Sequence, residues 1–316
     1  MSILAANRAS IARAARILCG GGIVAFPTET VYGLGALAFE PLAVARVFEA
    51  KKRPSFDPLI VHVLDRSMLS QVANELSGVA ERLARHFWPG PLTLVLAKSE
   101  SVPDLVTSGL QSVAVRMPSH PVARALLEQV NAPIAAPSAN PFGSLSPTRA
   151  EHVAKGLGSN VDLILDAGSS EHGLESTIVT CDPVPTLLRP GAIPVESIEA
   201  IAGSLARPAG GPVAAPGQLP YHYAPGTPLR VIDPSAVPSS QRARAGLLTL
   251  RDEFVGYAAL RVLSRRGDLR EAAAAFFEAL HALDALGLER IDAAPLPEIG
   301  LGLAMMDRLA RAAARA

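Results

Sequence analysis

Cysteine is scarce in this sequence, which has only Cys19 and Cys181 among its 316 residues. The two lie far apart, form no Cys-x-x-Cys motif and have no histidine at metal-ligand spacing. A disulfide framework or a zinc site is therefore not expected. We predict that both are small buried side chains of a protein in a reducing compartment.

Net charge is also absent, because 29 Lys and Arg side chains balance 29 Asp and Glu side chains. Residues 1–205 carry two more acidic than basic side chains, and residues 206–316 carry two more basic than acidic ones. Neither part has the broad positive field that attracts nucleic acid. A site for a polyanion must therefore be a local cluster of cations.

Long apolar runs are missing as well, and no stretch reaches the length of a membrane span. The first residues contain Arg and Ser but no acid, as in organelle transit peptides. A helix explains this segment better, because its apolar side chains recur at helical spacing and three glycines end it. These apolar residues are Ile11, Ala14, Ala15, Ile17 and Leu18. We expect a cytoplasmic protein that makes no contact with a membrane.

Short apolar runs alternate with amphipathic segments along most of the chain. Strands are predicted at residues 22–28, 58–64, 92–98, 112–118, 132–138, 162–168 and 176–181. Helices are predicted between them at residues 41–50, 76–88 and 120–130. Because 316 residues exceed the usual size of one core, two domains of the α/β class are expected. The first should contain a mixed sheet with long functional loops.

The composition changes after residue 205. Residues 206–227 are rich in Pro, Gly and Ala, and a new α/β pattern follows them. Its predicted strands are LRVI, GLLTL, AALRVLS and ERIDAAPLP, and its predicted helices are LREAAAAFFEALHALDALG and GLGLAMMDRLARAAA. We therefore divide the chain into a domain at 1–205, a linker at 206–227 and a small parallel α/β domain at 228–316.

The linker contains two of the four tyrosines, Tyr221 and Tyr223, on either side of His222. A flexible spacer lacks large side chains, and aromatic rings need a surface on which to pack. The rings could pack at the domain junction, or they could form a lid over a site on the first domain. The residues alone favour neither interpretation.

Two of the four lysines, Lys51 and Lys52, are adjacent, and Arg53 and Pro54 follow them. One interpretation is a solvated helix end, where cations favour the helix dipole and proline stops the helix. The other is a binding site for an anion. Because most charge runs are solvated, the cluster taken alone favours the first interpretation.

Two further stretches carry polar side chains beside predicted strands. The segment FPTETVYGLG has hydroxyls at Thr28 and Thr30, and its glycines would permit positive φ and close approach of the backbone to a ligand. It matches no phosphate-loop motif. Arg116 lies in an otherwise apolar strand, so we expect it to meet a carboxylate. That carboxylate could belong to an internal salt bridge or to a substrate.

Residues 136–153 place several hydroxyl and amide groups between a strand and a helix. Ser146 or Thr148 could cap the helix, and Glu151 would complete a capping box with Thr148. Capping explains one hydroxyl, whereas the others, with backbone amides at the helix start, would suit phosphate oxygens. The polar residues are Ser138, Asn140, Ser144, Ser146 and Thr148.

Motifs for covalent catalysis are absent. The sequence has no Gly-x-Ser-x-Gly elbow, no His-Glu-x-x-His motif and no carboxylate pair at metal spacing. Ser176 and Arg189 add one more hydroxyl and one more cation. Scattered hydroxyls and a few arginines favour the positioning of a polyanion over acid–base hydrolysis.

Taken together, these stretches resemble the L-threonylcarbamoyladenylate synthases, the YrdC-like family. The similar segments are GGIVAFPTETVYGLG, Lys-x-Arg-Pro, WPGPLTLVL, VAVRMPSHP, SAN with SPT, and ESTIV with LRPGAIP, over about residues 10–200. PGQLPYHYAPGTP and the unit after it resemble the two-domain form of the family. The resemblance implies a twisted mixed sheet with helices around a concave site, followed by a small Rossmann-like parallel domain.

The same resemblance implies a nucleotidyltransferase. Its substrates would be L-threonine, bicarbonate and ATP with Mg²⁺, and its products L-threonylcarbamoyl-AMP and pyrophosphate. A separate tRNA threonylcarbamoyltransferase complex would then transfer the threonylcarbamoyl group to the adenosine beside the anticodon of certain tRNAs. This reaction needs no enzyme nucleophile, because the carbamate oxygen attacks the α-phosphate while cations and a metal spread charge on the leaving group. Neither the metal's ligands nor direct tRNA binding is implied.

Site roles follow from the resemblance, residue by residue. Lys51 and Arg53 would be the catalytic cations at the triphosphate. The implied L-threonine contacts are Thr30, His62, Arg116 and Ser176. The implied ATP contacts are Lys51, Arg53, Asp57, Ser112, Ser138, Asn140, Ser146, Arg189 and Tyr223.

Two residues depart from the family pattern. Asp57 stands where Asn or a basic residue is more common, and it brings a negative charge beside the triphosphate. It would weaken the ATP contact or help to hold a metal. Phe142 takes a place usually given to a small hydroxyl residue.

Two other functions compete with this one. An RNA-binding module would use the same concave cationic surface without catalysis and would show a broad basic face with steep salt dependence. The acidic balance of residues 1–205 speaks against it. A carbamoyl-transfer domain like those of hydrogenase-maturation proteins would share the fold, but their zinc-finger and acylphosphatase-like segments are not visible here.

Overall fold

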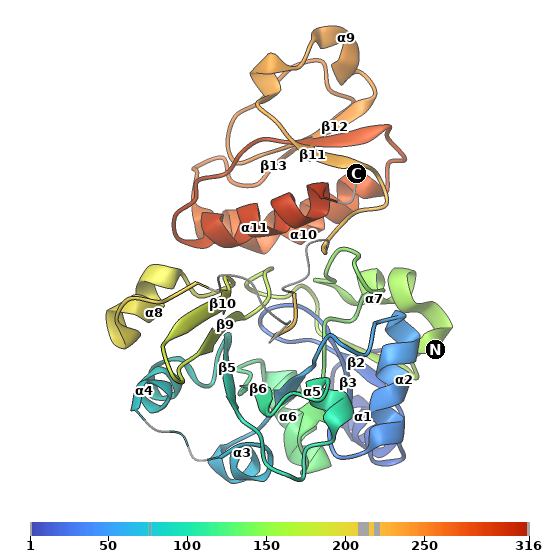
Figure 1. Cartoon of the computed structure of the whole chain (residues 1–316). Coiled ribbons are helices and arrows are strands. Elements are labelled where there is room, and N and C mark those ends of the chain that lie inside the picture. Colours follow the sequence, from blue (N-terminus) through green and yellow to red (C-terminus); the bar gives the residue numbers. More distant parts are fainter. Residues whose placement is uncertain (1, 75, 77, 208–214, 218–221, 315–316) are drawn as a thin grey trace.

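The computed structural model describes residues 2–74, 76, 78–207, 215–217 and 222–314. Two sheets, one above the other in Figure 1, form two units of the chain. We call the ten-stranded sheet with its helices the larger unit and the four-stranded sheet with its helices the smaller unit. None of the helices formed by the described residues has the length and apolar character that crossing a bilayer requires.

The larger unit has a mixed sheet with the strand order β1-β8-β2-β3-β7-β4-β6-β5-β9-β10. Its strands are β1 (Ser2–Ala5), β2 (Val24–Phe26), β3 (Gly33–Leu37), β4 (Ile60–His62), β5 (Leu92–Ala97), β6 (Ser112–Arg116), β7 (Ile134–Ala135), β8 (Leu163–Asp166), β9 (Thr177–Thr180) and β10 (Thr186–Arg189). All seven predicted strands are present, and the predicted mixed sheet is confirmed. Strands β1, β3 and β10 were not predicted, because they are short or rich in glycine.

Helices cover this sheet and connect its strands. They are α1 (Arg8–Cys19), α2 (Pro41–Lys51), α3 (Arg66–Val72), α4 (Gly78–Phe87), α5 (Asp104–Thr107), α6 (Pro121–Val130), α7 (Ala150–Leu157) and α8 (Val195–Ala202). The helix predicted near the N-terminus is α1, which ends at the C-cap Gly20. Cys19 is exposed and Cys181 is only half-buried, so the prediction that both are buried was wrong.

The cationic stretch at residues 51–53 straddles the end of α2. Lys51 is the last helical residue, and Lys52 adopts a left-handed conformation with φ of 52°. This turn leaves Lys52 exposed, whereas Lys51 and Arg53 are 1% and 7% exposed. A solvated helix end therefore explains only Lys52. The other two cations point into the protein.

The capping box predicted for α7 is not present. The helix begins at Ala150, one residue later than a Thr148 cap would allow, and its N-cap Arg149 makes no side-chain capping bond. The backbone N–H of Thr148 instead faces His152 Nδ1 at 3.3 Å. The hydroxyl of Ser146 donates to Glu175. These groups connect the loop to other elements and do not cap the helix.

Glycines 33 and 35 also differ from the prediction, because they lie in β3 and have no positive φ. A Cβ added to Gly35 would lie 2.7 Å from both Ile134 Cγ2 and Phe26 Cε1. At Gly33 the nearest atom to such a Cβ is Ala136 Cβ, at an ordinary 3.4 Å. Gly35 is therefore required by close packing of the sheet and not by a turn.

The smaller unit has an all-parallel sheet in the order β11-β14-β12-β13, as predicted. Its elements are β11 (Leu229–Val231), α9 (Ser239–Arg242), β12 (Ala245–Thr249), β13 (Ala259–Val262), α10 (Leu269–Asp284), β14 (Arg290–Ala293) and α11 (Leu301–Ala313). Figure 1 shows α10 and α11 between the two sheets. The apolar core of this unit extends into the larger unit through Val31, Leu145 and Leu174. The core of the smaller unit therefore crosses the junction, while the main core of the larger unit is a separate cluster.

We predict opposite effects on stability for alanine at the two glycines of β3. Gly35→Ala should lower the free energy of unfolding by about 1–3 kcal/mol, because Ile134 and Phe26 must shift to admit a methyl group. Gly33→Ala is the matched control in the same strand, and it should be neutral or slightly stabilising because alanine restricts the unfolded chain. Urea unfolding of both variants measures the difference. Equal stabilities would show that β3 is not tightly packed at Gly35.

Candidate active site

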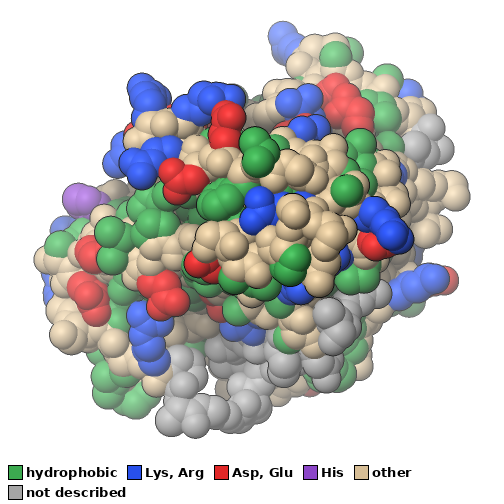
Figure 2. Space-filling model, turned by 90° about the horizontal axis from the view of Figure 1, so that it is seen from above, with side chains coloured by type: hydrophobic (Ala, Val, Ile, Leu, Met, Phe, Trp, Pro, Cys, Tyr) green, Lys and Arg blue, Asp and Glu red, His purple; other side chains and the backbone are tan. Residues whose placement is uncertain are grey.

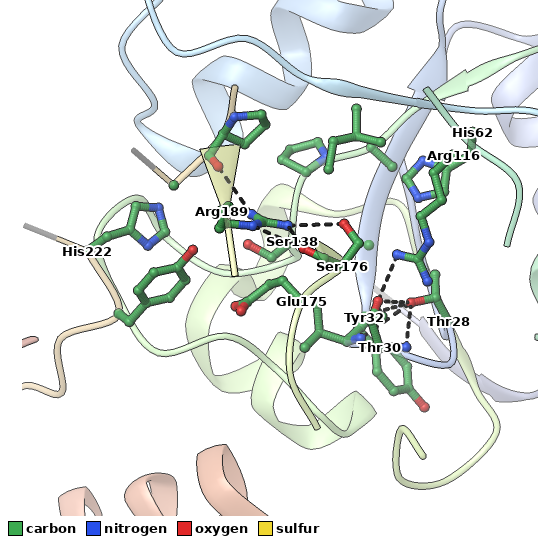
Figure 3. A pocket seen from close by; sticks show the side chains of 18 of the residues that line it. Thr28, Thr30, Tyr32, His62, Arg116, Ser138, Glu175, Ser176, Arg189 and His222 are labelled. Atoms are coloured by element: carbon green, nitrogen blue, oxygen red, sulfur yellow. Dashed lines mark hydrogen bonds between the residues drawn. The ribbon is translucent and has the colours of Figure 1, made fainter. Parts of the chain in front are cut away.

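A cavity lies beside the larger sheet (Figure 3). Its walls come from the loop between β2 and β3, the ends of β4 and β6, the segment after β7, the flanks of β9 and β10, and the linker. Strands β4 and β6 are parallel, and they place His62 level with Arg116 at their carboxyl ends. Ligands of α/β proteins commonly bind outside such strand ends.

Eight of the predicted site residues line this cavity. They are Thr30, Arg53, His62, Arg116, Ser138, Ser176, Arg189 and Tyr223. These residues are spread over more than 190 positions of the sequence, and the fold brings them together. We call the region around Arg116 the Arg116 end of the cavity and the region around Arg189 the Arg189 end.

Arg116 organises its end of the cavity through two contacts. Its Nη1 donates to Thr30 Oγ1 at 2.8 Å, and its Nη2 forms an ion pair with Glu29 Oε1 at 2.6 Å. The Thr30 hydroxyl also hydrogen-bonds to Thr28 Oγ1 at 2.8 Å. The internal salt bridge considered for Arg116 is therefore present, and the same residue faces the cavity. A substrate carboxylate at Arg116 remains a prediction.

The charge states at this end follow from burial and from Arg116. Burial by itself raises the pKa of Glu29, but the ion pair with Arg116 lowers that pKa to about 2, so the carboxylate is ionised. Burial and the positive charge of Arg116 lower the pKa of His62 to about 3, so the imidazole is neutral at pH 7. His62 Nδ1 is buried without a hydrogen-bond partner among the described residues. A buried polar atom without a partner in a cavity wall can be satisfied by a water, an ion or a ligand.

At the Arg189 end, two guanidinium groups differ in their partners. Arg53 forms an ion pair with Asp57 (Nη2–Oδ2, 2.9 Å) and donates to two backbone carbonyls. Arg189 donates to the Ser176 carbonyl at 2.9 Å, to its hydroxyl at 3.1 Å and to the Pro216 carbonyl at 3.3 Å. Within the described part of the chain, Arg189 has no ion pair. Burial lowers the pKa of Arg53. Asp57 and Tyr223 raise this pKa and Arg189 lowers it, so Arg53 lies close enough to Tyr223 and Arg189 to interact with them electrostatically.

Five predicted contacts do not line the cavity. Lys51 Nζ donates to the carbonyls of Ser138 (2.6 Å) and Asn140, so it supports the loop that carries Ser138. Burial lowers the pKa of Lys51 well below its usual range. The Asn140 amide bonds to the Pro141 and Ser144 carbonyls within the same loop.

The other three lie elsewhere. Asp57 is fully buried as the counter-ion of Arg53, so it orients that cation. Ser146 is also fully buried and donates to Glu175. Ser112 begins β6, opposite Ala97, four residues before Arg116. The structure does not bring Ser112 to the cavity.

The linker closes the Arg189 end. Pro216 and Gly217 line the cavity together with His222 and Tyr223. Gly217 has φ of 81°, and a Cβ there would lie 2.4 Å from the Tyr223 hydroxyl. Tyr223 contacts Phe277 of the smaller unit (6.0 Å between ring centroids) and also lines the cavity, so its position is compatible with both interpretations of the aromatic linker. Tyr221 lies outside the described residues.

Phe142, a departure from the family pattern, packs against this linker. Its ring meets the His222 ring edge-on at 5.7 Å between centroids. The backbone N–H of Phe142 donates to the Lys51 carbonyl at 2.8 Å. The larger side chain therefore extends the contact between the linker and the loop that contains Ser138, Ala139 and Asn140, which we call the SAN loop.

Three important residues were missed by the sequence analysis: Glu29, Glu175 and Arg308. Glu29 lies between Thr28 and Thr30, and Glu175 precedes Ser176, so their place in the two motifs was the available signal. Arg308 belongs to the amphipathic pattern of α11 and looks like a surface residue in the sequence. Its contact with Glu175 arises only when the two units meet.

The carboxylates near the cavity do not form a metal site. Among the described residues, no group of three or more His, Cys, Asp and Glu side chains could hold a metal ion. Asp57, Glu29 and Glu175 each form an ion pair with an arginine. They therefore offer no free carboxylate cage for Mg²⁺, which prefers oxygen ligands in octahedral geometry.

Comparisons with known proteins agree with this architecture. The family described as "Telomere recombination" matches residues 16–191, and the family described as "Threonylcarbamoyl-AMP synthase, C-terminal domain" matches residues 193–314. A Bacillus subtilis protein named threonylcarbamoyl-AMP synthase is 43% identical over 98% of this chain and 94% of its own length.

Two solved structures of the Pyrococcus abyssi protein Sua5 are similar to this one. The complex with L-threonine has a TM-score of 0.90 at 39% identity, covering 98% of this chain and 96% of that chain. A variant in which one histidine and one tyrosine are replaced by alanine has a TM-score of 0.91 at 38% identity, covering 99% and 96%. The chain therefore belongs to the threonylcarbamoyl-AMP synthase family in its two-domain form.

Proposed function

We propose that this protein synthesises L-threonylcarbamoyl-AMP and pyrophosphate from L-threonine, bicarbonate and ATP. It would thus act as a nucleotidyltransferase in the threonylcarbamoyladenosine modification of tRNA. Relatives that match nearly the whole chain carry the name of this activity, and one similar structure contains L-threonine. The observation in this structure that best supports the proposal is a buried excess of positive charge at the cavity.

This excess is unusual for a chain without net charge. Four arginines at or beside the cavity, Arg53, Arg116, Arg189 and Arg308, are at most 7% exposed. Three of them have a buried carboxylate partner, and Arg189 has none among the described residues. A buried cation without a counter-ion is costly. An anionic substrate such as a nucleotide triphosphate would supply the missing charge.

The two ends of the cavity suit two substrates. We propose that ATP phosphates bind at the Arg189 end, between Arg53 and Arg189 and beneath Tyr223. L-Threonine would bind at the Arg116 end, with its carboxylate at Arg116 and its polar groups at Thr30, His62 and Ser176. Neutral His62 can donate or accept a hydrogen bond there.

Chemistry would take place where the two ends meet, near Ser138 and Ser176. A carbamate formed from the threonine amine and bicarbonate would attack the α-phosphate through its oxygen and displace pyrophosphate. Positioning and charge stabilisation are sufficient for such a transfer. Arg53 and Arg189 would stabilise the pyrophosphate leaving group. Lys51 and Asp57 would act indirectly, by holding the SAN loop and Arg53.

Magnesium would enter together with ATP. Because every carboxylate near the cavity is paired with arginine, the phosphate oxygens of the nucleotide would hold the ion. Bicarbonate needs a small polar space beside the threonine amine, and the hydroxyls of Thr30 and Ser176 could bound it.

The remaining parts of the proposal concern organisation and partners. We propose that residues 1–205 form the catalytic domain, 206–227 the lid and 228–316 a domain that supports the lid. The product would pass in the cytoplasm to a separate tRNA threonylcarbamoyltransferase complex. RNA binding by a cationic surface is less well supported, because Figure 2 shows basic and acidic side chains interspersed on the face seen there.

The function is tested by pyrophosphate release. The protein is incubated with ATP, magnesium, bicarbonate and one of several amino acids, and the adenylate is identified by mass spectrometry. Release should require both L-threonine and bicarbonate, and serine or valine should give little product. Absence of a threonine-dependent adenylate from folded protein would contradict the proposal. RNA titration against salt concentration would then test the binding-module alternative.

Two variants test whether ATP and L-threonine bind at different ends of the cavity. Both are chosen so that no buried charge loses its partner. Arg53→Met/Asp57→Asn removes both members of one ion pair and should raise KM for ATP by tenfold or more, on the order of 1.4 kcal/mol of lost binding. Arg116→Lys keeps a charge beside Glu29 but loses the guanidinium fork, so it should raise KM for L-threonine first. Steady-state kinetics with each substrate varied separately measure both. Equal effects on the two substrates in both variants would show that the two ends are not separate sites.

A further inference from the structure

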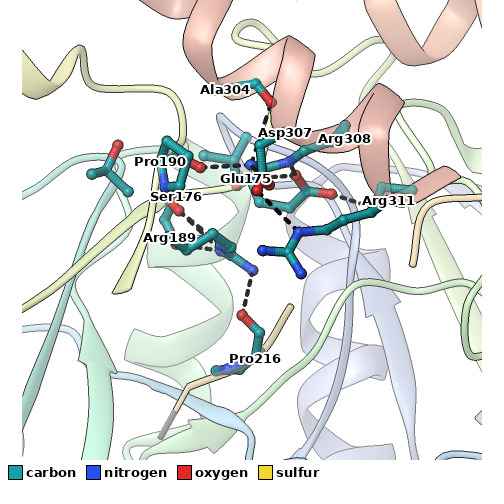
Figure 4. Close-up of polar contacts among 12 residues, drawn as sticks. Glu175, Ser176, Arg189, Pro190, Pro216, Ala304, Asp307, Arg308 and Arg311 are labelled. Atoms are coloured by element: carbon teal, nitrogen blue, oxygen red, sulfur yellow. Dashed lines mark hydrogen bonds and ion pairs between the residues drawn. The ribbon is translucent and has the colours of Figure 1, made fainter. Parts of the chain in front are cut away.

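Arg308 belongs to the smaller unit but reaches Glu175, a residue in the wall of the cavity of the larger unit (Figure 4). It lies on α11 and is only 1% exposed. Its Nε and Nη2 contact Glu175 Oε2 at 3.1 and 3.0 Å, and its Nη1 donates to the Pro190 carbonyl at 2.7 Å. Nη1 also forms an ion pair with Asp307 at 3.0 Å. A single guanidinium thus joins the two units.

Two of these contacts, those with Glu175 and Pro190, lie one residue from a proposed substrate contact. Glu175 precedes Ser176, and Pro190 follows Arg189. Glu175 also accepts a hydrogen bond from Ser146, in the loop that continues to Ser138. Arg308 therefore fixes the segments before β9 and after β10 relative to each other. Glu175 and Ser176 of the first segment line the cavity, as does Arg189, which directly precedes the second.

Arg308 also supports the linker. Its guanidinium carbon lies 5.0 Å from the centre of the Tyr223 ring, within the range of a cation–π contact. Tyr223 is 1% exposed and has φ of 63°, a left-handed conformation that is strained for a large side chain. Such a conformation persists only when neighbouring groups impose it. The contacts that impose it here come from Arg308, Phe277 and the Gly143 carbonyl, which accepts from the Ala224 N–H at 2.8 Å.

Stability alone does not account for a fully buried arginine at this place. A buried ion pair is weak evidence for stability, because a protein is often at least as stable when apolar side chains of similar volume replace the pair. Neighbouring positions of the interface are in fact apolar, as Phe277 and Leu174 illustrate. What a guanidinium adds is direction, since its planar fork can hold a carboxylate, a carbonyl and a ring at once.

We propose that Arg308 is a positioning residue through which the smaller unit holds Tyr223 and the Arg189 end in the arrangement that binds ATP. This inference rests on the proposed function, because it assumes that ATP occupies the Arg189 end. It gives the smaller unit a role in nucleotide affinity without a ligand of its own. Threonine binding at the Arg116 end is independent of it.

The expected size of the effect follows from populations. Suppose that, without Arg308, Tyr223 keeps the position described here in only one molecule out of ten. The apparent affinity for ATP then falls about tenfold. Arg308→Met should therefore raise KM for ATP about tenfold and change KM for L-threonine by less than about twofold. Arg308→Lys keeps the charge beside Glu175 but loses the flat fork, so its KM for ATP should lie between those of wild type and Arg308→Met.

The control removes another contact between the units. Glu278 of α10 forms an ion pair with Arg149 at 3.0 Å, and neither residue lines the cavity. Glu278→Gln should leave both KM values unchanged. If Arg308→Met does not fold, Arg308→Lys carries the test, because it leaves no buried carboxylate unpaired.

A measurement without substrate separates this inference from the proposed function. Hydrogen exchange of the Ala224 amide reports on the linker, and it should be about tenfold faster in the Arg308 variants than in wild type or Glu278→Gln. The double variant Arg308→Met/Tyr223→Leu should have about the same KM for ATP as Tyr223→Leu alone, because Arg308 acts on ATP through Tyr223.

The possible outcomes are distinct. Unchanged exchange at Ala224 and unchanged KM for ATP in the Arg308 variants would overturn the inference, as would an equal effect of Glu278→Gln. Faster exchange in the Arg308 variants, with a wild-type protein that makes no threonine-dependent adenylate, would refute the proposed function while leaving the structural role of Arg308 intact. Faster exchange together with a selective rise in KM for ATP would support both.

Discussion

The matching of buried cations to their partners is the constraint on which the rest of the structure depends. Arg53, Arg116 and Arg308 are almost completely buried, and each has a buried carboxylate within 3.0 Å. These pairs set the distance between strands, loops and units, because an unmatched charge in the interior is costly. Arg189 is the exception, since it binds only carbonyl and hydroxyl oxygens among the described residues. This cation, which lacks an ion-pair partner in the described part of the chain, lies in the wall of the cavity.

The same pairs join parts of the chain that are distant in sequence. Arg53 and Asp57 are close neighbours, but Arg116 reaches back to Glu29 and Arg308 to Glu175. The last of these crosses from α11 to the segment before β9, and the apolar core crosses at the same interface. The smaller unit is therefore part of the architecture of the site. The larger unit contributes the cavity floor, and the linker covers one end.

Several features could be predicted from the sequence, and the reasons differ. The strands that contain His62 and Arg116 are apolar runs, so their period and length indicated them directly. The end of α2 before Pro54 followed from proline chemistry. In contrast, Thr148 with Glu151 satisfied a capping pattern, yet α7 begins after Arg149 because Thr148 faces His152. The glycines of β3 resembled a loop, although Gly35 is required by packing against Phe26 and Ile134.

The sequence by itself determined the α/β class, the two-part organisation and the family, because these depend on local periodicity and on motifs that can be read in order. Its motifs also singled out Arg53, Arg116 and Arg189, which line the cavity. Only the tertiary structure decided what each of these side chains does: Lys51 supports a loop, Asp57 orients Arg53, Ser112 lies away from the cavity, and Arg308 pairs with Glu175 in the cavity wall. The physical reason is that a charged side chain is defined by the partners it meets on burial, and those partners come from other strands, from the linker and from the other unit.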